Sequence, residues 1–453
     1  MVVMAMTRGP KAAIKAKFPF VVGAVSVGTL LEWYGFYLYS GLAGVLSAQF
    51  LPGGLDHGIL YGIGIFWTGF AVRPVGAVLF GYLGDSVGRK FAFTLAMMTM
   101  GGASFVIGCL PGFASIGWAA PLLLILCRLA QGVAMGGEYG GAATYIAEHA
   151  ADGNRGLYTS WLQTTATMGI VLALLVILVC RLALGDAAFS DWAWRIPFWI
   201  SAALVGLAIY IQLTLEESPL FERLKRQGKT AANPAKESFS GVKNWKSILL
   251  VVFGATAPEG VVWYTGQFYA LFYLSTVLKL PYGTVYILMI VALTCAVPFF
   301  IVFGALSDKI GRRNIMTLGF LLAALSYWPV FSWMADLKDN PLMLGILIFY
   351  LAILVTMVYG PIAAFLVELF PTRIRCTSMS LPYQVGNGMF GGLVPLAGAS
   401  LAATFGGPLY ALFYPIGVAL LGVIVSLVGL RPRTNDVRIW DETGAPPPVP
   451  EQP

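Results

Sequence analysis

Twelve long apolar stretches divide this chain, and they constrain its fold more than any other feature of the sequence. A helix needs about 20 apolar residues to cross the hydrocarbon core of a bilayer, and only helices and closed barrels satisfy their backbone hydrogen bonds there. The chain has 11% charged residues, against about 25% in soluble proteins. We therefore expect an all-α membrane protein with twelve transmembrane helices near residues 18–46, 58–84, 91–111, 118–147, 157–183, 195–215, 247–278, 281–306, 314–335, 341–369, 377–404 and 407–430.

The longest polar interval lies in the middle of the chain and separates two sets of six stretches. The end of the chain is Pro-rich and charged, which is typical of a disordered tail. We predict five segments: a cytosolic tail (1–17), a six-helix bundle (18–215), a cytosolic loop (216–246), a second six-helix bundle (247–430) and a cytosolic tail (431–453).

Basic residues accumulate in alternate connections between the apolar stretches. If the N-terminus is cytosolic, that side receives 22 of the 28 lysines and arginines, whereas the far side receives Arg181, Arg195, Lys279 and Lys338. Cytosolic loops of membrane proteins carry an excess of Lys and Arg. The bias predicts that both termini are cytosolic, and it explains the net charge of +7 without a nucleic-acid partner.

A ten-residue motif occurs once in each set of six stretches. GYLGDSVGRK (81–90) is repeated as GALSDKIGRR (304–313), with Asp85 matching Asp308. Two similar sets of spans with repeated cytosolic motifs indicate a parallel duplication, which is typical of transporters whose halves rock around a midplane site.

Acidic and basic residues also recur in matched pairs near the cytosolic ends. Glu148 and Arg155 lie seven residues apart, as do Glu368 and Arg375. Positive-inside topology alone does not explain why acids recur at matched positions. We expect a charge network that latches the outward-open state and that includes Asp85, Arg89, Glu148, Arg155, Asp308, Arg312, Glu368 and Arg375.

The repeated motif resembles the cytosolic signature of the major facilitator superfamily, and RLAQG (128–132) is similar to the arginine motif of its fourth span. A narrower resemblance exists to the metabolite:proton symporter family, which includes transporters of 2-oxoglutarate, citrate, shikimate and proline or betaine. It rests on residues 31–41, 73–90, 128–142, 217–224 and 368–392. The resemblance implies the major facilitator fold, a monomer, and a cavity lined by the first, fourth, seventh and tenth spans.

One position departs from this family. The family usually has an acidic residue after the EW-aromatic sequence of the first span, and here that residue is Gly35. Any role of that acid in relatives cannot be transferred to this chain. Glu32 lies nearby, and Glu259 is a candidate replacement.

Five ionisable residues lie inside the apolar stretches: Glu32, Arg73, Arg128, Glu138 and Glu259. Such residues are costly in a bilayer and persist when they are paired, hydrated or functional. The arginines are candidates to bind a substrate carboxylate, and the glutamates are candidates to carry a proton; the alternative is that they pair and hold helices together. The tenth stretch has no counterpart of Arg128 or Glu138, which places the expected coupling site mainly in the N-terminal half.

Further polar and aromatic residues are candidate substrate contacts. Glu259, Trp263 and Gln267 follow a four-residue spacing and share one face of a regular helix, and Tyr383 and Asn387 have the same spacing. Packing and interhelical hydrogen bonding are the alternative for each of them. The expected substrate-binding set is Arg128, Arg73, Tyr34, Gln163, Trp263, Gln267, Tyr383 and Asn387.

The sequence contains no metal-ligand spacing, catalytic triad or phosphate-binding loop. We therefore expect no enzymatic activity and no cofactor, with a proton gradient as the energy source. The predicted function is proton-coupled uptake of a small organic acid across the inner membrane of a bacterial cell. The alternative is uptake of a zwitterionic osmolyte, held by an aromatic cage of Tyr34, Tyr37, Trp263 and Tyr264. A sensor that binds without transport is a further alternative.

Overall fold

A computed structural model describes residues 10–51, 65, 67–150, 153–214, 217, 219–228, 231 and 233–430. All regular structure in these residues is helical. Residues 1–9 of the expected N-terminal tail, the expected C-terminal tail (431–453), residues 52–64 at the first predicted connection and the start of the second predicted span, and parts of the central loop lie outside the described residues. The five-segment division and the cytosolic position of both termini remain predictions.

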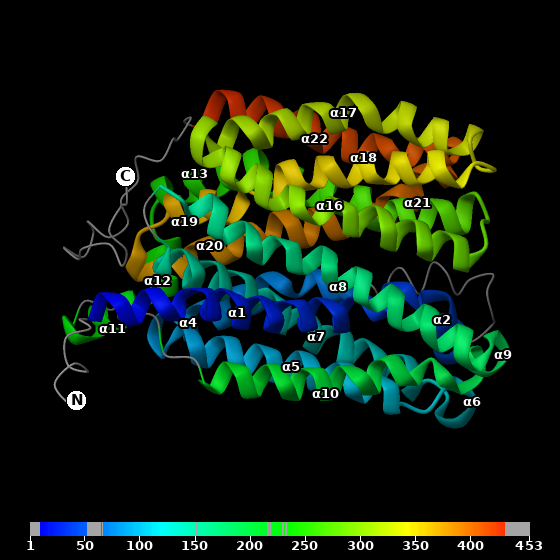
Figure 1. Cartoon of the computed structure of the whole chain (residues 1–453), viewed down its shortest axis with the longest axis horizontal. Helices are drawn as coiled ribbons and strands as arrows, with labels where there is room; N and C mark the ends of the chain where they lie inside the picture. Colours follow the sequence, from blue (N-terminus) through cyan, green and yellow to red (C-terminus); the bar gives the residue numbers. More distant parts are fainter. Residues whose placement is uncertain are drawn as a thin grey trace, which may run out of the picture.

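The helices form two groups that lie one above the other with nearly parallel axes (Figure 1). The N-terminal half consists of α1 (Pro10–Gly41), α2 (Ala43–Phe50), α4 (Arg73–Ser86), α5 (Arg89–Cys109), α6 (Phe113–Ile116), α7 (Ala119–His149), α8 (Arg155–Leu184), α9 (Asp186–Ala188) and α10 (Arg195–Thr214). Two short helices follow in the central loop, α11 (Pro219–Arg226) and α12 (Pro234–Phe239).

The C-terminal half forms the second group, drawn in green to red in Figure 1. It consists of α13 (Val242–Val251), α14 (Ala257–Tyr264), α15 (Ala270–Phe272), α16 (Tyr282–Ile310), α17 (Arg312–Asp336), α18 (Pro341–Tyr359), α19 (Ile362–Leu369), α20 (Arg375–Tyr383), α21 (Val394–Phe405) and α22 (Phe413–Gly429).

Among the described residues, nine helical segments are long and apolar enough to cross a membrane. A tenth is added if Asp186–Ala193 and Arg195–Tyr210, which meet at 61°, count as one span. The segments that correspond to the first two expected spans, α1–α2 and residues 65–86, are not among the ten. The all-helical membrane fold is therefore confirmed, while the number of twelve spans remains a prediction.

Two of the expected continuous helices are interrupted by π-helical turns. The seventh span has such turns at Val252–Thr256, Thr265–Tyr269 and Tyr273–Val277, and the eleventh has one at Gln384–Gly391. π-helical turns are rare and occur frequently at functional sites. A π-helical turn contains more residues than a turn of α-helix. The π-helical turn at Thr265–Tyr269 therefore shifts Gln267 away from the helix face that Glu259 and Trp263 share.

The two halves meet along two helix pairs, α8 with α16 and α4 with α20. Close approach of the first pair depends on glycines. A Cβ atom on Gly156 would lie 2.3 Å from the carbonyl oxygen of Gly304, and one on Gly304 would lie 2.4 Å from Cβ of Ser160. Small residues let backbones approach in this way between membrane helices. This contact holds the start of α8 against the end of α16.

Candidate functional site

A tight crossing of α4 and α7 places Arg73 beside Glu138. A Cβ atom on Gly76 would lie 2.0 Å from the carbonyl oxygen of Val133, and one on Gly136 would lie 2.2 Å from that of Arg73. Any larger residue at either position would push the helices apart. The glycines around Glu138 therefore set the distance between the two helices that carry the buried charges.

Glu138 faces a second carboxyl group, that of Glu32 on α1. The two side chains interact directly, and Glu138 also lies next to Thr29 and near Arg73. Both glutamates are buried, with exposures of 1% and 2%. The structure thus brings together three of the five buried charges expected from the sequence, all of them in the N-terminal half.

Arg73 is 1% exposed and lies where the two halves meet. Its guanidinium carbon lies 4.5 Å from the ring centre of Phe36 and 4.2 Å from that of Phe70. Within the described part of the chain, its Nε and Nη2 atoms have no hydrogen-bond partner. Stacking on aromatic rings holds a guanidinium without using its N–H groups. Arg73 therefore retains donors for a carboxylate.

Arg128 shares the Phe36 ring with Arg73 but is also bonded to a side chain of its own helix. Its guanidinium carbon lies 4.3 Å from the ring centre of Phe36 and 4.6 Å from that of Tyr39. Nη1 donates to Oε1 of Gln131 (2.7 Å), and Nε2 of Gln131 donates to Oγ of Ser104 (2.8 Å). This network joins α7 to α1 and α5, so the geometry favours Arg73 over Arg128 as the substrate contact.

Gly35, at the position of the acid in relatives, faces this network. A Cβ atom there would lie 2.9 Å from Oγ of Ser104. An acid at position 35 would therefore meet α5. The departure from the family pattern affects the packing around Ser104 and Gln131, whereas Glu32 lies on the side of α1 that faces Glu138.

A small enclosed cavity lies beside Arg73 and Glu138. Its volume is about 10 Å³, close to the room that one water molecule needs. Its lining comes from both halves and comprises Thr29, Trp33, Arg73, Met135, Glu138, Tyr139, Ala142, Leu162, Tyr383 and Gln384. Of the expected substrate contacts, Arg73 and Tyr383 line it. Sequence reasoning did not single out Thr29, Tyr139 and Gln384: Tyr139 and Gln384 lie in stretches that carry the family resemblance (128–142 and 368–392), but no spacing marks them as cavity residues.

A group of tyrosines lies next to this cavity and crosses between the halves. The rings of Tyr139 and Tyr383 stack with centres 3.6 Å apart and an angle of 7°. The Tyr383 and Tyr359 hydroxyls lie 3.2 Å apart. Nε2 of Gln163 donates to the Tyr139 hydroxyl (2.8 Å) and to the carbonyl oxygen of Tyr359 (3.0 Å). Gln163 therefore holds this group together and does not line the cavity.

Glu259 lies in the C-terminal half and is completely buried. Its carboxylate oxygens accept from Nδ2 of Asn387 at 2.9 and 3.1 Å. The structure brings these two expected site residues together, although the sequence places them 128 positions apart. Both side-chain polar atoms of buried Gln267 have no hydrogen-bond partner among the described residues.

The expected aromatic cage is formed in part. Trp263 stacks on Tyr37 (5.7 Å between centres, 22°) and contacts Tyr264 (4.9 Å). Tyr34 points elsewhere, because its hydroxyl donates to the carbonyl oxygen of Pro197 on α10 (2.8 Å). The geometry does not place Tyr34 at the cavity.

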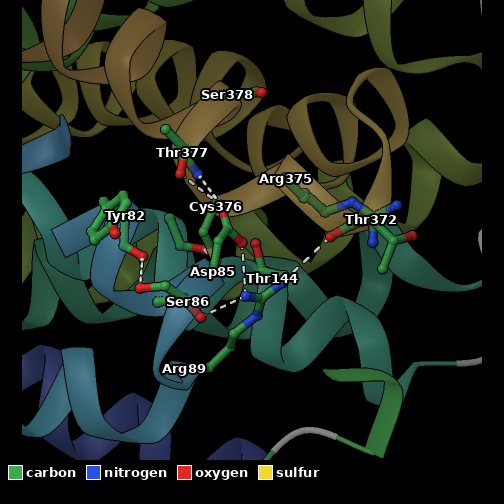
Figure 2. Close-up of polar contacts among 12 residues, drawn as sticks. Tyr82, Asp85, Ser86, Arg89, Thr144, Thr372, Arg375, Cys376, Thr377 and Ser378 are labelled. Carbon is green, nitrogen blue, oxygen red and sulfur yellow. Dashed lines mark hydrogen bonds and ion pairs between the residues drawn. The ribbon is translucent and has the colours of Figure 1, made fainter. Parts of the chain in front are cut away.

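Figure 2 shows the first of two ion-pair clusters at one end of the interface. Asp85 pairs with Arg89 (2.7 Å) and accepts from the backbone N and Oγ1 of Thr377 (2.9 and 2.7 Å). Glu148 pairs with Arg375 (3.4 Å). Thr377 lies in the first turn of α20, where backbone N–H groups and the helix dipole favour a negative charge. Asp85 thus joins α4 to the opposite half. We call these residues the Asp85 cluster.

The second cluster has the same arrangement with the halves exchanged. Asp308 pairs with Arg312 (2.5 Å) and accepts from the backbone N–H groups of Gly156 (3.0 Å) and Leu157 (2.9 Å), which begin α8. Glu368 contacts both Arg312 (3.0 Å) and Arg155 (3.5 Å). We call these residues the Asp308 cluster. All eight residues expected in the charge network lie in these two clusters.

The fold and the two duplicated clusters agree with a comparison of the sequence with known families. The sequence model described as Major Facilitator Superfamily matches residues 25–381 and again residues 260–451. The chain belongs to the major facilitator superfamily. It is therefore a multi-pass membrane transporter and not an enzyme. Within the described residues, no group of three or more His, Cys, Asp or Glu side chains could hold a metal ion.

The chain is similar to the alpha-ketoglutarate permease of Escherichia coli (36% identity, 90% of this chain, 92% of the relative). It is also similar to the proline/betaine transporter of that organism (31%, 92% and 86%). A third relative there, an inner membrane metabolite transport protein, is 33% identical over 85% of this chain and 88% of its own length. The resemblance to metabolite:proton symporters is confirmed.

A solved structure shares the fold. The proton:xylose symporter bound to 6-bromo-6-deoxy-D-glucose superimposes with a TM-score of 0.72 at 17% identity, over 93% of this chain and 98% of the other. At this identity the similarity concerns the arrangement of helices alone. This arrangement of helices confirms the major facilitator fold that the sequence predicts.

Proposed function

We propose that this protein takes up a small organic acid together with a proton, by alternating access. The observation that carries this proposal is the position of Arg73. A buried guanidinium with unused donors lies at the junction of the halves, beside a cavity that both halves line. A carboxylate is the ligand whose charge and planar geometry match a guanidinium.

The Glu32–Glu138 pair is the proposed proton carrier. Two carboxylates in contact repel each other in surroundings of low dielectric constant, and one shared proton removes that repulsion. Arg73 lies near Glu138, so an ionised Glu138 competes with the substrate carboxylate for the same cation. A proton on the pair removes this competition. Binding of the proton and binding of the substrate then favour each other to the same extent, as linkage requires.

The two ion-pair clusters supply the conformational step. They join the halves at one end, which we assign to the cytosol from the distribution of basic residues. Release of substrate on that side requires both clusters to separate. The ionic and helix-terminus contacts of the clusters then stabilise the state that is closed to the cytosol, and their loss favours the open one.

The test is uptake into vesicles that contain the purified protein. With an alkaline interior, the wild-type protein accumulates a labelled dicarboxylate and carries protons inward, which a trapped pH dye reports. We expect Arg73→Lys to lower kcat/KM by on the order of tenfold or more, since lysine cannot bind a carboxylate in a bidentate way. The matched control is Arg181→Lys, because Arg181 pairs with Asp186 outside the cavity. Uptake that ignores the proton gradient contradicts the coupling.

Glu138→Gln tests the proton carrier separately. We expect exchange of substrate across the membrane to continue while uphill accumulation is lost, because a neutral glutamine no longer competes with the substrate for Arg73 and so unlinks proton binding from substrate binding. Glu259→Gln is the comparison, since Glu259 interacts with Asn387 in the other half. If only Glu259→Gln abolishes accumulation, the proton carrier lies in the C-terminal half and the assignment to Glu32 and Glu138 is wrong.

A second candidate function, uptake of a zwitterion such as betaine, is supported by Glu259. Its carboxylate lies near the hydroxyls of Tyr139, Tyr359 and Tyr383. A quaternary ammonium group favours aromatic faces and a nearby negative charge. Competition separates the two functions: betaine displaces a bound dicarboxylate only if both use one site. Binding of betaine without binding of any simple carboxylate favours the second candidate.

A further inference from the structure

We propose that Gln384 selects substrates that carry a hydrogen-bond donor, either a hydroxyl or an ammonium group, beside the carboxylate bound by Arg73. The inference rests on the proposed function and concerns the same cavity. It adds a specificity-determining residue in the stretch (368–392) that carries the family resemblance.

The orientation of the Gln384 amide is fixed by the opposite half of the protein. Its Nε2 atom donates to the backbone carbonyl oxygens of Met135 (2.9 Å) and Gly136 (3.3 Å) on α7. Only the nitrogen of the amide can donate to a carbonyl group. The amide oxygen of Gln384 therefore points away from α7 and presents an acceptor.

That acceptor is buried and unused. Gln384 is 1% exposed, and its Oε1 atom has no hydrogen-bond partner among the residues that the structure describes. A buried acceptor without a donor is unfavourable, because it has lost its water and gained nothing. A ligand that supplies a donor at this point restores the lost hydrogen bond, whereas a ligand without one leaves the oxygen unsatisfied.

Gln384 and Arg73 approach each other around one glycine of the π-helical turn. A Cβ atom on Gly388 would lie 3.1 Å from Cδ of Arg73 and 3.2 Å from Oε1 of Gln384. Both residues also line the cavity beside Glu138. The cavity has room for about one water molecule as it stands, so on this proposal it widens when substrate enters. A carboxylate bound to Arg73 then places its neighbouring carbon atom near the Gln384 oxygen. A substituent on that carbon meets an acceptor, which favours a hydroxyl or ammonium group over a hydrogen atom or a keto oxygen.

The test compares carboxylates that differ in one substituent. Succinate and malate form one pair, and propionate and lactate form another; pyruvate adds a keto oxygen in place of the hydroxyl. Dissociation constants of the purified full-length protein are measured for each. We expect the wild-type protein to bind the hydroxy acid of each pair at least about tenfold more tightly, since a site that hydrogen-bonds a hydroxyl rejects analogues that lack it. Pyruvate is expected to bind more weakly than lactate.

Two variants separate selectivity from a structural role. Gln384→Met keeps the length of the side chain and removes the acceptor, so the hydroxy-to-deoxy ratio falls towards one. Gln163→Met is the matched control, because Gln163 also joins the halves through Nε2 and a backbone carbonyl but does not line the cavity. We expect Gln163→Met to change the dissociation constants of the hydroxy acid and of its deoxy analogue by the same factor.

The possible results are distinguishable. If the wild-type protein shows no preference for the hydroxy acids, or if Gln384→Met retains that preference, the role of Gln384 is wrong while carboxylate transport stands. The same holds if Gln384→Met weakens both members of each pair equally, because a structural contact or a bound water then explains the residue. If no carboxylate binds to the wild-type protein, the proposed function itself fails and this inference fails with it.

Discussion

The Asp85 and Asp308 clusters are built from matching residues but are connected differently. In each, an aspartate of one half binds the first turn of a helix in the other half. Asp85 uses one backbone N–H and the hydroxyl of Thr377, whereas Asp308 uses two backbone N–H groups. In both clusters a glutamate lies close to two arginines: Glu368 contacts Arg155 and Arg312, and Glu148 pairs with Arg375 and lies near Arg89. A shared carboxylate couples its partners, so we infer that the Asp308 cluster opens as a unit.

The difference also shows what duplication preserves. Both halves keep the acid and the arginine of the repeated motif, because an aspartate at a helix N-terminus needs only backbone groups that every helix has. The remaining contacts depend on side chains outside the motif, such as Thr377, and these differ. The two clusters are therefore alike in their ion pairs and unlike in the donors that hold each aspartate.

The largest expected effect comes from Glu368→Gln, which breaks two contacts of the Asp308 cluster. Removing one partner of a buried ion pair costs about 3–5 kcal/mol, and the loss favours the state that is open to the cytosol. The buried thiol of Cys376, which lies in the Asp85 cluster, reports the change through its rate of reaction with a maleimide. The assay requires a background in which the other four cysteines are replaced.

The matched control for this variant is Glu222→Gln, since Glu222 pairs with Arg226 on the exposed face of α11. We expect no change in the Cys376 reaction there. An unchanged rate in Glu368→Gln contradicts the idea that the Asp308 cluster holds the halves together.

A smaller effect is expected from Thr377→Val, which removes the hydroxyl donor to Asp85 and retains the backbone N–H. A hydrogen bond to a charged group contributes about 1.5–3 kcal/mol, so the melting temperature falls and the Cys376 thiol reacts faster. Thr159→Val is the control. Thr159 is equally buried, but its hydroxyl bonds to the carbonyl oxygen of Arg155 in its own helix. Equal effects of the two variants would falsify the specific role of the Thr377 hydroxyl.

Coupling within the Asp308 cluster is tested by a double-mutant cycle on Arg155 and Arg312. Both contact Glu368 and repel each other, so either single change leaves Glu368 with one arginine, and replacing both by glutamine costs more than the two single changes together. We expect a coupling of about 0.5–3 kcal/mol, the range found for residues that share a partner, measured as the free energy of unfolding in detergent. Strict additivity would show that the two arginines act independently.

The smallest effect is expected from Arg373→Ala, next to the Asp85 cluster. Arg373 pairs with Glu237 of α12, and the two side chains are 53% and 33% exposed. Exposed ion pairs contribute about 0–1 kcal/mol. We expect the free energy of unfolding to fall by no more than this amount and transport to stay close to that of the wild-type protein. The fall in stability should be smaller still at high salt. A loss of transport as large as that of Glu368→Gln would mean that α12 is part of the switch.

The sequence by itself determined the charged residues of both clusters. All eight residues follow from repeated acids and bases at fixed offsets, because the same short motif builds the same turn in each half. It also determined which residues are buried charges, since any ionisable group inside a long apolar stretch is exceptional. The family followed from the same motifs.

The tertiary structure decided which of these groups meet. Spacing along a helix shows which residues share a face, but the rotation of that helix against its neighbours sets what the face contacts. The α4–α7 crossing places Arg73 by the cavity, and Arg128 binds Gln131 within its own half. The π-helical turn at Gln384–Gly391 also brings Gln384 to α7 and Asn387 to Glu259. A π turn depends on packing between helices, and no local pattern in the sequence specifies it.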